Sequence, residues 1–152
     1  MLLQIGEKAP EFELLDENSV IRKLSDFQGK PVLLYFYPKD DTPGCTVEAC
    51  NFRDDYGNYE KAGVVILGIS PDSPKSHIKF KKKYNLPFTL LSDEAHNVCN
   101  LYGVWGPKKY MGRSYEGVYR MTFLIDRGGR LVRIYENVKP DGHSSQILAD
   151  LA

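Results

Sequence analysis

Two cysteines, Cys45 and Cys50, stand five positions apart in the stretch DDTPGCTVEAC, residues 40–50. This spacing is wider than the C-x-x-C of redox pairs and does not match the spacings typical of zinc sites. A plant-type iron–sulfur pattern, C-x₄-C-x₂-C, would need a third cysteine where the chain has Arg53. The pair therefore favours chemistry carried by sulfur over metal binding.

The residues ahead of Cys45 are typical of a helix start. Thr42 is a good N-cap, because its hydroxyl can accept from a free amide of the first turn, and Pro43 suits the first helical position. Cys45 then falls in the first turn, where unpaired amides and the helix dipole stabilise an anion. An ordinary thiol, with a pKa of about 8.5, is only a few per cent ionised at pH 7, and lowering it by about two units would make the thiolate the major form. We expect an exposed, electropositive position and a reactive Cys45.

Helix geometry separates the two thiols. Five residues along a helix turn through about 140° and rise about 7.5 Å, which places the two Cα atoms about 8–9 Å apart. A disulfide needs Cα atoms within about 7 Å. If Cys45 and Cys50 form a bond, the first turns of the helix must therefore unwind; an inert Cys50 remains the alternative.

The other cysteine and the histidines are not expected to do chemistry. Cys99 lies in an apolar helical pattern, HNVCNLYG, and is predicted to be a packed core thiol. His77, His96 and His143 are scattered along the chain, far in sequence from the cysteine motif. Solvated or helix-capping roles are predicted for all three.

Alternating apolar and helical segments position these residues. The opening strands, 11–15 and 19–24, predict a hairpin around residues 16–18, and the last two strands are joined by a tight turn at 127–129. Strand–helix–strand units followed by a hairpin predict an α/β sandwich with a mixed sheet. The predicted later strands are 31–37, 64–70, 89–93, 121–126 and 130–136, and the predicted helices are 43–62, 73–84, a short segment through Cys99 and Tyr102, and 142–151.

Length and composition predict one globular domain, residues 1–152. Twenty basic residues balance twenty acidic ones, and the run KFKKK at 79–83 is interpreted as the wet face of a helix, not a nucleic-acid site, because no stacking aromatics accompany it. The chain shows neither a secretory signal pattern nor an apolar run of membrane-spanning length, so we expect a cytoplasmic protein without membrane contact. In a reducing cytoplasm, neighbouring cysteines are more often catalytic, redox-active or metal-binding than structural.

The motif Pro38-x-x-x-Thr42-x-x-Cys45, within FYPKDDTPGCT, resembles the active-site signature of the peroxiredoxins. Its continuation, PGCT-x-E-x-C, is similar to the bacterioferritin comigratory protein branch, also called peroxiredoxin Q. Further matches, which extend the resemblance over nearly the whole chain, are GEKAPEFEL, GVVILGISPDS, YGVWG and YRMTFLID.

The resemblance implies a role for each matching residue. Cys45 would be the peroxidatic cysteine, which attacks a peroxide oxygen and becomes a sulfenic acid, and Cys50 would resolve it as an intramolecular disulfide. Thr42 would hydrogen-bond the substrate oxygens, Pro38 would shield the pocket, and Arg120 would be the active-site arginine. The implied fold is a thioredoxin-like sandwich, a central mixed sheet flanked by helices, with an N-terminal β-hairpin extension.

The implied activity is that of an atypical 2-Cys, thiol-dependent peroxidase in antioxidant defence. Hydrogen peroxide and alkyl hydroperoxides would be the substrates, and thioredoxin or a similar dithiol protein would be the reductant. The branch is commonly monomeric, and neither a metal nor another cofactor is implied, because sulfur carries the redox change. Two departures from the pattern are Met121, where smaller or polar residues are usual, and Cys99, which is not at a resolving position.

An arginine at position 120 suits peroxide chemistry, whereas Glu48 would need a cation to neutralise its charge beside Cys45. A fixed cation and oriented donors stabilise the negative charge that grows on a departing oxygen, and a guanidinium supplies both. Glu48 lies three residues past Cys45 on nearly the same helix face, so its charge would oppose the thiolate unless an arginine neutralises it. Arg53 and Arg120 are both candidates.

Two other function classes stay open at this point. A disulfide oxidoreductase or holdase chaperone would act on protein thiols, but the chain contains no C-x-x-C. A non-catalytic module would have inert thiols or a structural metal. Peroxide consumption and the titration of Cys45 distinguish these classes from a peroxidase.

Overall fold

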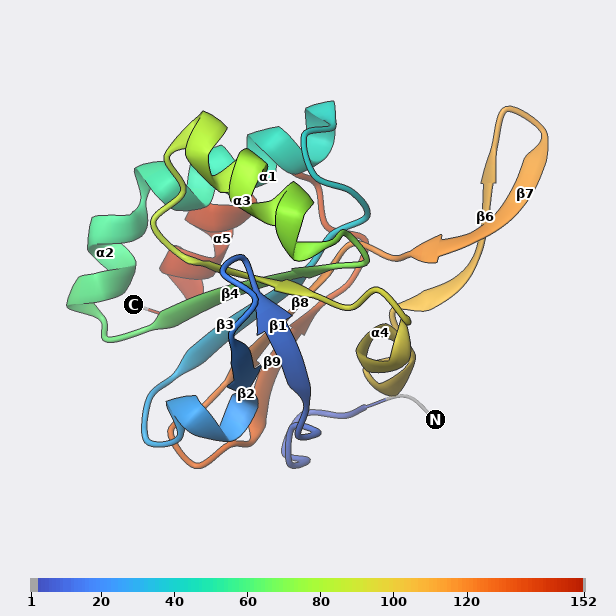
Figure 1. Cartoon of the computed structure of the whole chain (residues 1–152). Coiled ribbons are helices and arrows are strands. Elements are labelled where there is room, and N and C mark those ends of the chain that lie inside the picture. Colours follow the sequence, from blue (N-terminus) through green and yellow to red (C-terminus); the bar gives the residue numbers. More distant parts are fainter. Residues whose placement is uncertain (1–2, 152) are drawn as a thin grey trace.

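A mixed sheet forms the centre of the molecule, as predicted (Figure 1). The computed structural model describes residues 3–151; the ends of the predicted domain, residues 1–2 and 152, lie outside that range. Within it, seven strands pair in the order β2-β1-β5-β4-β3-β8-β9, with β3, β4 and β5 parallel and the other neighbours antiparallel. These strands are β1 (Glu13–Asp16), β2 (Ile21–Lys23), β3 (Val32–Phe36), β4 (Val65–Ser70), β5 (Thr89–Ser92), β8 (Met121–Ile125) and β9 (Leu131–Tyr135).

Helices cover both faces of the sheet, and the central strand β3 is buried throughout. Its side chains alternate between two apolar clusters: Leu33 and Tyr35 pack on one face, and Leu34 and Phe36 on the other. None of the helices in the described part of the chain is long and apolar enough to cross a membrane. The Leu33 face carries α1 (Pro43–Asp54), α2 (Tyr56–Lys61), α3 (Pro74–Tyr84) and α5 (His143–Leu151), and the Leu34 face carries α4 (Asn97–Leu101) with the N-terminal segment.

The predicted helix 43–62 is wrong, because two helices occupy this range. The first, α1, ends at Asp54, and Asp55 leaves the helical conformation with φ −93° and ψ 3°. The side chain of Asp55 accepts from Ser144 of α5 at 2.7 Å, and Tyr59 of α2 bonds the same serine. Contacts with α5 thus stabilise the break between α1 and α2 at Asp55. The predicted strand 19–24 is also shorter, since a 3₁₀ turn, η1 (Leu24–Phe27), follows β2.

A second hairpin was not predicted from the sequence. Among residues 3–151, strands β6 (Trp105–Tyr110) and β7 (Arg113–Val118) pair only with each other, and they project from the body of the molecule (Figure 1). Their turn is Met111-Gly112, with φ of 51° and 79°. Turns with these left-handed conformations usually contain Asn-Gly or Asp-Gly. Because this turn contains Met-Gly, the sequence did not indicate a hairpin here.

Phe52 is the aromatic centre of the helix-covered face, and its truncation should be costly. Its ring is fully buried and lies 4.8 Å from the ring of Tyr35 and 6.0 Å from that of Tyr59, measured between centroids. We expect Phe52→Ala to lower the free energy of unfolding by about 3–5 kcal/mol in urea denaturation. The control Val47→Ala, on the exposed side of α1, should change it by less than about 1 kcal/mol. Equal effects of the two variants would contradict this assignment of the core.

Candidate active site

Cys45 lies in the first turn of α1, the helix that follows β3 in the chain. Its residue is only 1% exposed, so the predicted exposed position is wrong: the thiol packs in the same apolar cluster as Tyr35 and Ala49. The predicted electropositive neighbour is present, however. Nη2 of Arg120 donates to Sγ of Cys45 at 3.4 Å. Because water is largely excluded, this cation acts on the sulfur with little screening.

Arg120 reaches α1 from the residue just before β8 and contacts two groups there. Nη1 donates to Oε1 of Glu48 at 2.7 Å while Nη2 contacts the sulfur of Cys45. Gly44 makes room for this approach, because a Cβ at that position would lie 3.1 Å from Nη2. One guanidinium therefore bridges two side chains that stand one helical turn apart on α1.

The arginine that faces Glu48 is thus Arg120 and not Arg53. Arg53 is turned elsewhere: it donates to the backbone oxygen of Tyr84 at 2.7 Å and to Asp54 at 3.1 Å. The sequence left this choice open because no spacing rule places either arginine beside Glu48: Arg53 is five residues away on the helix, and Arg120 lies in a distant segment.

Burial of the Glu48 carboxyl makes the charge balance of the site depend on pH. Burial raises the pKa of Glu48 to about 7, although the charge and hydrogen bond of Arg120 act in the opposite direction. Burial lowers the pKa of Arg120, but the charges of Glu48 and Cys45 outweigh it, so this pKa is raised and the guanidinium stays charged. Oε2 of Glu48 and the hydroxyl of Tyr35 are buried without a hydrogen-bond partner among residues 3–151.

Thr42 and Pro38 belong to the loop that leads into α1. Thr42 is the N-cap residue and Pro43 follows at the first helical position, as predicted. The predicted cap bond is wrong, because the Thr42 hydroxyl donates to the backbone oxygen of Lys39 at 2.9 Å instead of accepting from a first-turn amide. Pro38 is half-buried at the end of β3. The roles of Thr42 and Pro38 toward a substrate stay predictions.

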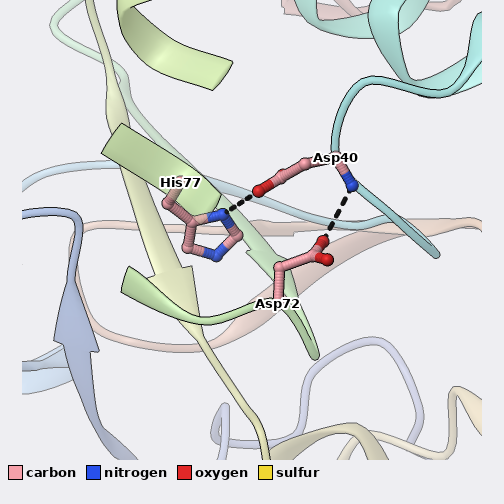
Figure 2. A group of neighbouring side chains, drawn as sticks. All are labelled: Asp40, Asp72 and His77. Carbon is pink, nitrogen blue, oxygen red and sulfur yellow. Dashed lines mark hydrogen bonds and ion pairs between the residues drawn. The ribbon is translucent and has the colours of Figure 1, made fainter. Parts of the chain in front are cut away.

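A buried hydrogen-bond network fixes this loop (Figure 2). One carboxylate oxygen of Asp40 accepts from Tyr37 at 2.6 Å, and the other accepts from Ser76 at 2.8 Å and lies 2.7 Å from Nδ1 of His77. The backbone N–H of Asp40 donates to Asp72 at 2.8 Å. Although Asp40, Asp72 and His77 are close enough together to be considered as metal ligands, both oxygens of Asp40 already have protein partners. The cluster fits an anchor between the loop and α3.

The predicted solvated or capping roles of the histidines are wrong for two of the three. His77 is fully buried, and its second nitrogen lies 3.0 Å from the backbone oxygen of Leu91. His143 is also buried, with Nε2 at 2.7 Å from the hydroxyl of Thr122, and burial lowers its pKa. His96 is the N-cap residue of α4, but its side chain makes no cap bond; the half-buried ring stacks on that of Trp105 with 3.8 Å between centroids. No sequence signal revealed these contacts, because each joins positions far apart in the chain.

The three cysteines are all free, and their surroundings differ. Cys50 is half-buried on α1, and the intact helix between Cys45 and Cys50 has the geometry that places their Cα atoms about 8–9 Å apart. Cys99 is fully buried in the opposite cluster, which confirms the predicted packed thiol. Burial, followed by the neighbouring Asp93 carboxylate, raises the Cys99 pKa far above its usual range.

Comparison with known proteins identifies relatives along almost the whole chain. The profile of the AhpC/TSA family matches residues 5–134. Peroxiredoxin Bcp of Bacillus subtilis is 48% identical over 151 residues, which cover 99% of this chain and 96% of the relative.

Solved structures of similar proteins share the fold. A PrxQ variant of Xylella fastidiosa matches with a TM-score of 0.93 and 33% identity, over 99% of this chain and 96% of that one. The bacterioferritin comigratory protein of Xanthomonas campestris, described for its alkyl peroxide reduction activity, matches with a TM-score of 0.87 and 36% identity, over 92% and 89%. The expected thioredoxin-like sandwich is confirmed by these matches.

The raised pKa of Glu48 predicts how stability changes with pH. Between pH 4.5 and about 7 the folded chain keeps a proton that the unfolded chain has lost, so the free energy of unfolding falls as pH rises through this window. Glu48→Gln cannot lose that proton. The free energy of unfolding of the variant, minus that of the wild type, should therefore increase by roughly 2–4 kcal/mol from pH 4.5 to about pH 7, measured by urea denaturation.

Glu60→Gln, at an exposed position on α2, is the control: its free energy of unfolding should change with pH in parallel with that of the wild type. A Glu48→Gln profile that also runs parallel would show that Glu48 is not held in its neutral form below pH 7.

Proposed function

Because the chain belongs to the AhpC/TSA family and, within it, to the Bcp and peroxiredoxin Q peroxiredoxins, which are peroxidases, we propose that it reduces hydroperoxides with Cys45 as the attacking thiol. The observation that supports this assignment is the contact between Arg120 and the sulfur of Cys45 in the first turn of a helix. A cation at 3.4 Å and the amides of the helix start both favour the thiolate, which is the nucleophilic form.

In the first step, the Cys45 thiolate attacks one oxygen of the hydroperoxide, and the O–O bond breaks. The sulfur becomes a sulfenic acid, and the departing oxygen leaves as water or an alcohol after taking up a proton. Arg120 stabilises the charge that grows on that oxygen. Thr42 already donates its hydroxyl hydrogen to Lys39, so its oxygen is free to accept the O–H of the hydroperoxide. Pro38 shields the thiolate and the bound peroxide from water.

In the second step, the thiol of Cys50 condenses with the sulfenic acid, which forms a disulfide and releases water. Since the intact helix keeps the two cysteines beyond bonding range, the first turns of α1 unwind for this step. The Asp40 network holds the loop immediately before the unwinding segment, so the motion is confined to the helix.

An external dithiol protein, such as thioredoxin, then reduces the disulfide by thiol–disulfide exchange and is itself oxidised. Both cysteines lie on one chain, so a monomer completes the cycle, and a reducing cytoplasm suits it. We propose hydrogen peroxide and alkyl hydroperoxides as substrates; the relative from Xanthomonas campestris is described for alkyl peroxide reduction.

Mapping the linked sulfurs tests the cycle. After one equivalent of hydrogen peroxide, mass spectrometry should find a bond between Cys45 and Cys50 in the wild type and in Cys99→Ser. Cys50→Ser should consume about one equivalent and stop as a sulfenic or over-oxidised acid, and Cys45→Ser should consume almost none. A disulfide that involves Cys99, or turnover by Cys45→Ser, would contradict the assignment.

Removing the guanidinium should slow the first step. Arg120→Ala is best made in the Glu48→Gln background, which avoids leaving an unpaired buried carboxylate. We expect the second-order rate constant for hydrogen peroxide to fall about a hundredfold or more in stopped-flow measurements, as when an oxyanion donor is lost. Arg113→Ala, an exposed arginine on β7, is the control. A rate constant equal to that of the control would show that Arg120 does not take part in the first step.

A further inference from the structure

One lysine of the β6–β7 hairpin, Lys108, points back toward the base of the hairpin, close to the segment in which Arg120 precedes β8. Nζ of Lys108 donates to the backbone oxygen of Val118 at 2.9 Å, two residues before Arg120. Gly117 leaves the path of the lysine stem open, because a Cβ there would lie 3.0 Å from Cδ of Lys108. The neighbouring Lys109, by contrast, is exposed. The hairpin therefore holds the Lys108 ammonium at its base and leaves Lys109 in solvent.

Lys108 lies in a groove that also contains Arg120 of the candidate active site. Together with Tyr119 and Arg120 it lines one groove of about 860 Å³, in which Glu136 is the other charged residue and is itself exposed. Burial and the nearby Arg120 charge lower the pKa of Lys108, while the charge of Cys45 acts in the opposite direction. Its cross-strand neighbour on β7 is Tyr115. The ammonium thus lies in the same groove as Arg120, the residue that contacts the sulfur of Cys45.

The charge balance of the site calls for such a group. Arg120 contacts two groups that can each carry a negative charge, Glu48 and Cys45. When both are ionised, the guanidinium alone leaves a net charge of −1 in a buried place, which opposes the thiolate. A second cation makes the four groups neutral as a set.

We propose that Lys108 is that second cation: from the base of the hairpin, its ammonium stabilises the Cys45 thiolate and the negative charge on the departing oxygen. The inference rests on the proposed reaction of Cys45. It also gives the projecting hairpin a function, which is to hold a positive charge beside the site with a stem that crosses Gly117.

Lys108→Met tests the charge while keeping most of the stem, and Lys109→Met is the matched control on the same strand. In a background that keeps only Cys45, with Cys50→Ser and Cys99→Ser, iodoacetamide alkylation is measured against pH. The pH of half-maximal alkylation should rise by roughly 0.5–1 unit in Lys108→Met and stay unchanged in Lys109→Met. The stopped-flow rate with hydrogen peroxide at pH 7.5 should fall about three- to tenfold. Lys108→Arg, which keeps the positive charge, should show the alkylation pH and the peroxide rate of the protein with Lys108.

Coincident alkylation profiles for the two methionine variants would overturn the inference. So would a failure of Lys108→Arg to recover, since that result would assign Lys108 only to packing of the hairpin. If Cys45 consumed no peroxide in any version, the proposed function would fail, while the alkylation profiles would still decide whether Lys108 acts on the thiolate.

Discussion

The guanidinium of Arg120, bound at once to the sulfur of Cys45 and the carboxylate of Glu48, is the contact on which the site depends. It joins the residue before β8 to the first turns of α1, and a Cβ at Gly44 would crowd its approach. Because the sulfur and the carboxylate are both buried, neither charge is well solvated, and Arg120 is the cation in direct contact with both groups. The same arrangement explains why the pKa of Glu48 is raised despite its ion pair: burial outweighs the attraction.

Contacts with neighbouring helices anchor the chain on both sides of α1. Before the helix, Asp40 is tied to α3 through Ser76 and His77. After it, Asp55 is tied to α5 through Ser144. Between these anchors lie Cys45 and Cys50, which an intact helix keeps out of bonding range. In the proposed cycle this segment unwinds, which requires low local stability, and the anchors on both sides limit the opening to the segment that contains the two thiols.

Sequence reasoning predicted the features that depend on neighbouring residues. The start of α1 at Thr42-Pro43, the doubly buried β3 and the separation of Cys45 from Cys50 all follow from local spacing, and the resemblance to peroxiredoxins supplied the link to Arg120. It failed where distant residues decide. The burial of Cys45, the contact of Asp40 with His77 and the break at Asp55 all come from packing between segments far apart in the chain. The β6–β7 hairpin was missed because an unusual Met-Gly turn closes it, and Lys108 was missed with it.

The central claim is that Arg120 holds the sulfur of Cys45 as an anion in the folded protein. It is tested most directly by following the ultraviolet absorbance of the thiolate against pH in a chain that keeps only Cys45, with Arg120 present and with Arg120→Ala, both in the Glu48→Gln background. The thiolate should form at a clearly lower pH when Arg120 is present, while circular dichroism shows the same fold in both proteins. Coincident absorbance curves from the two folded proteins would contradict the account.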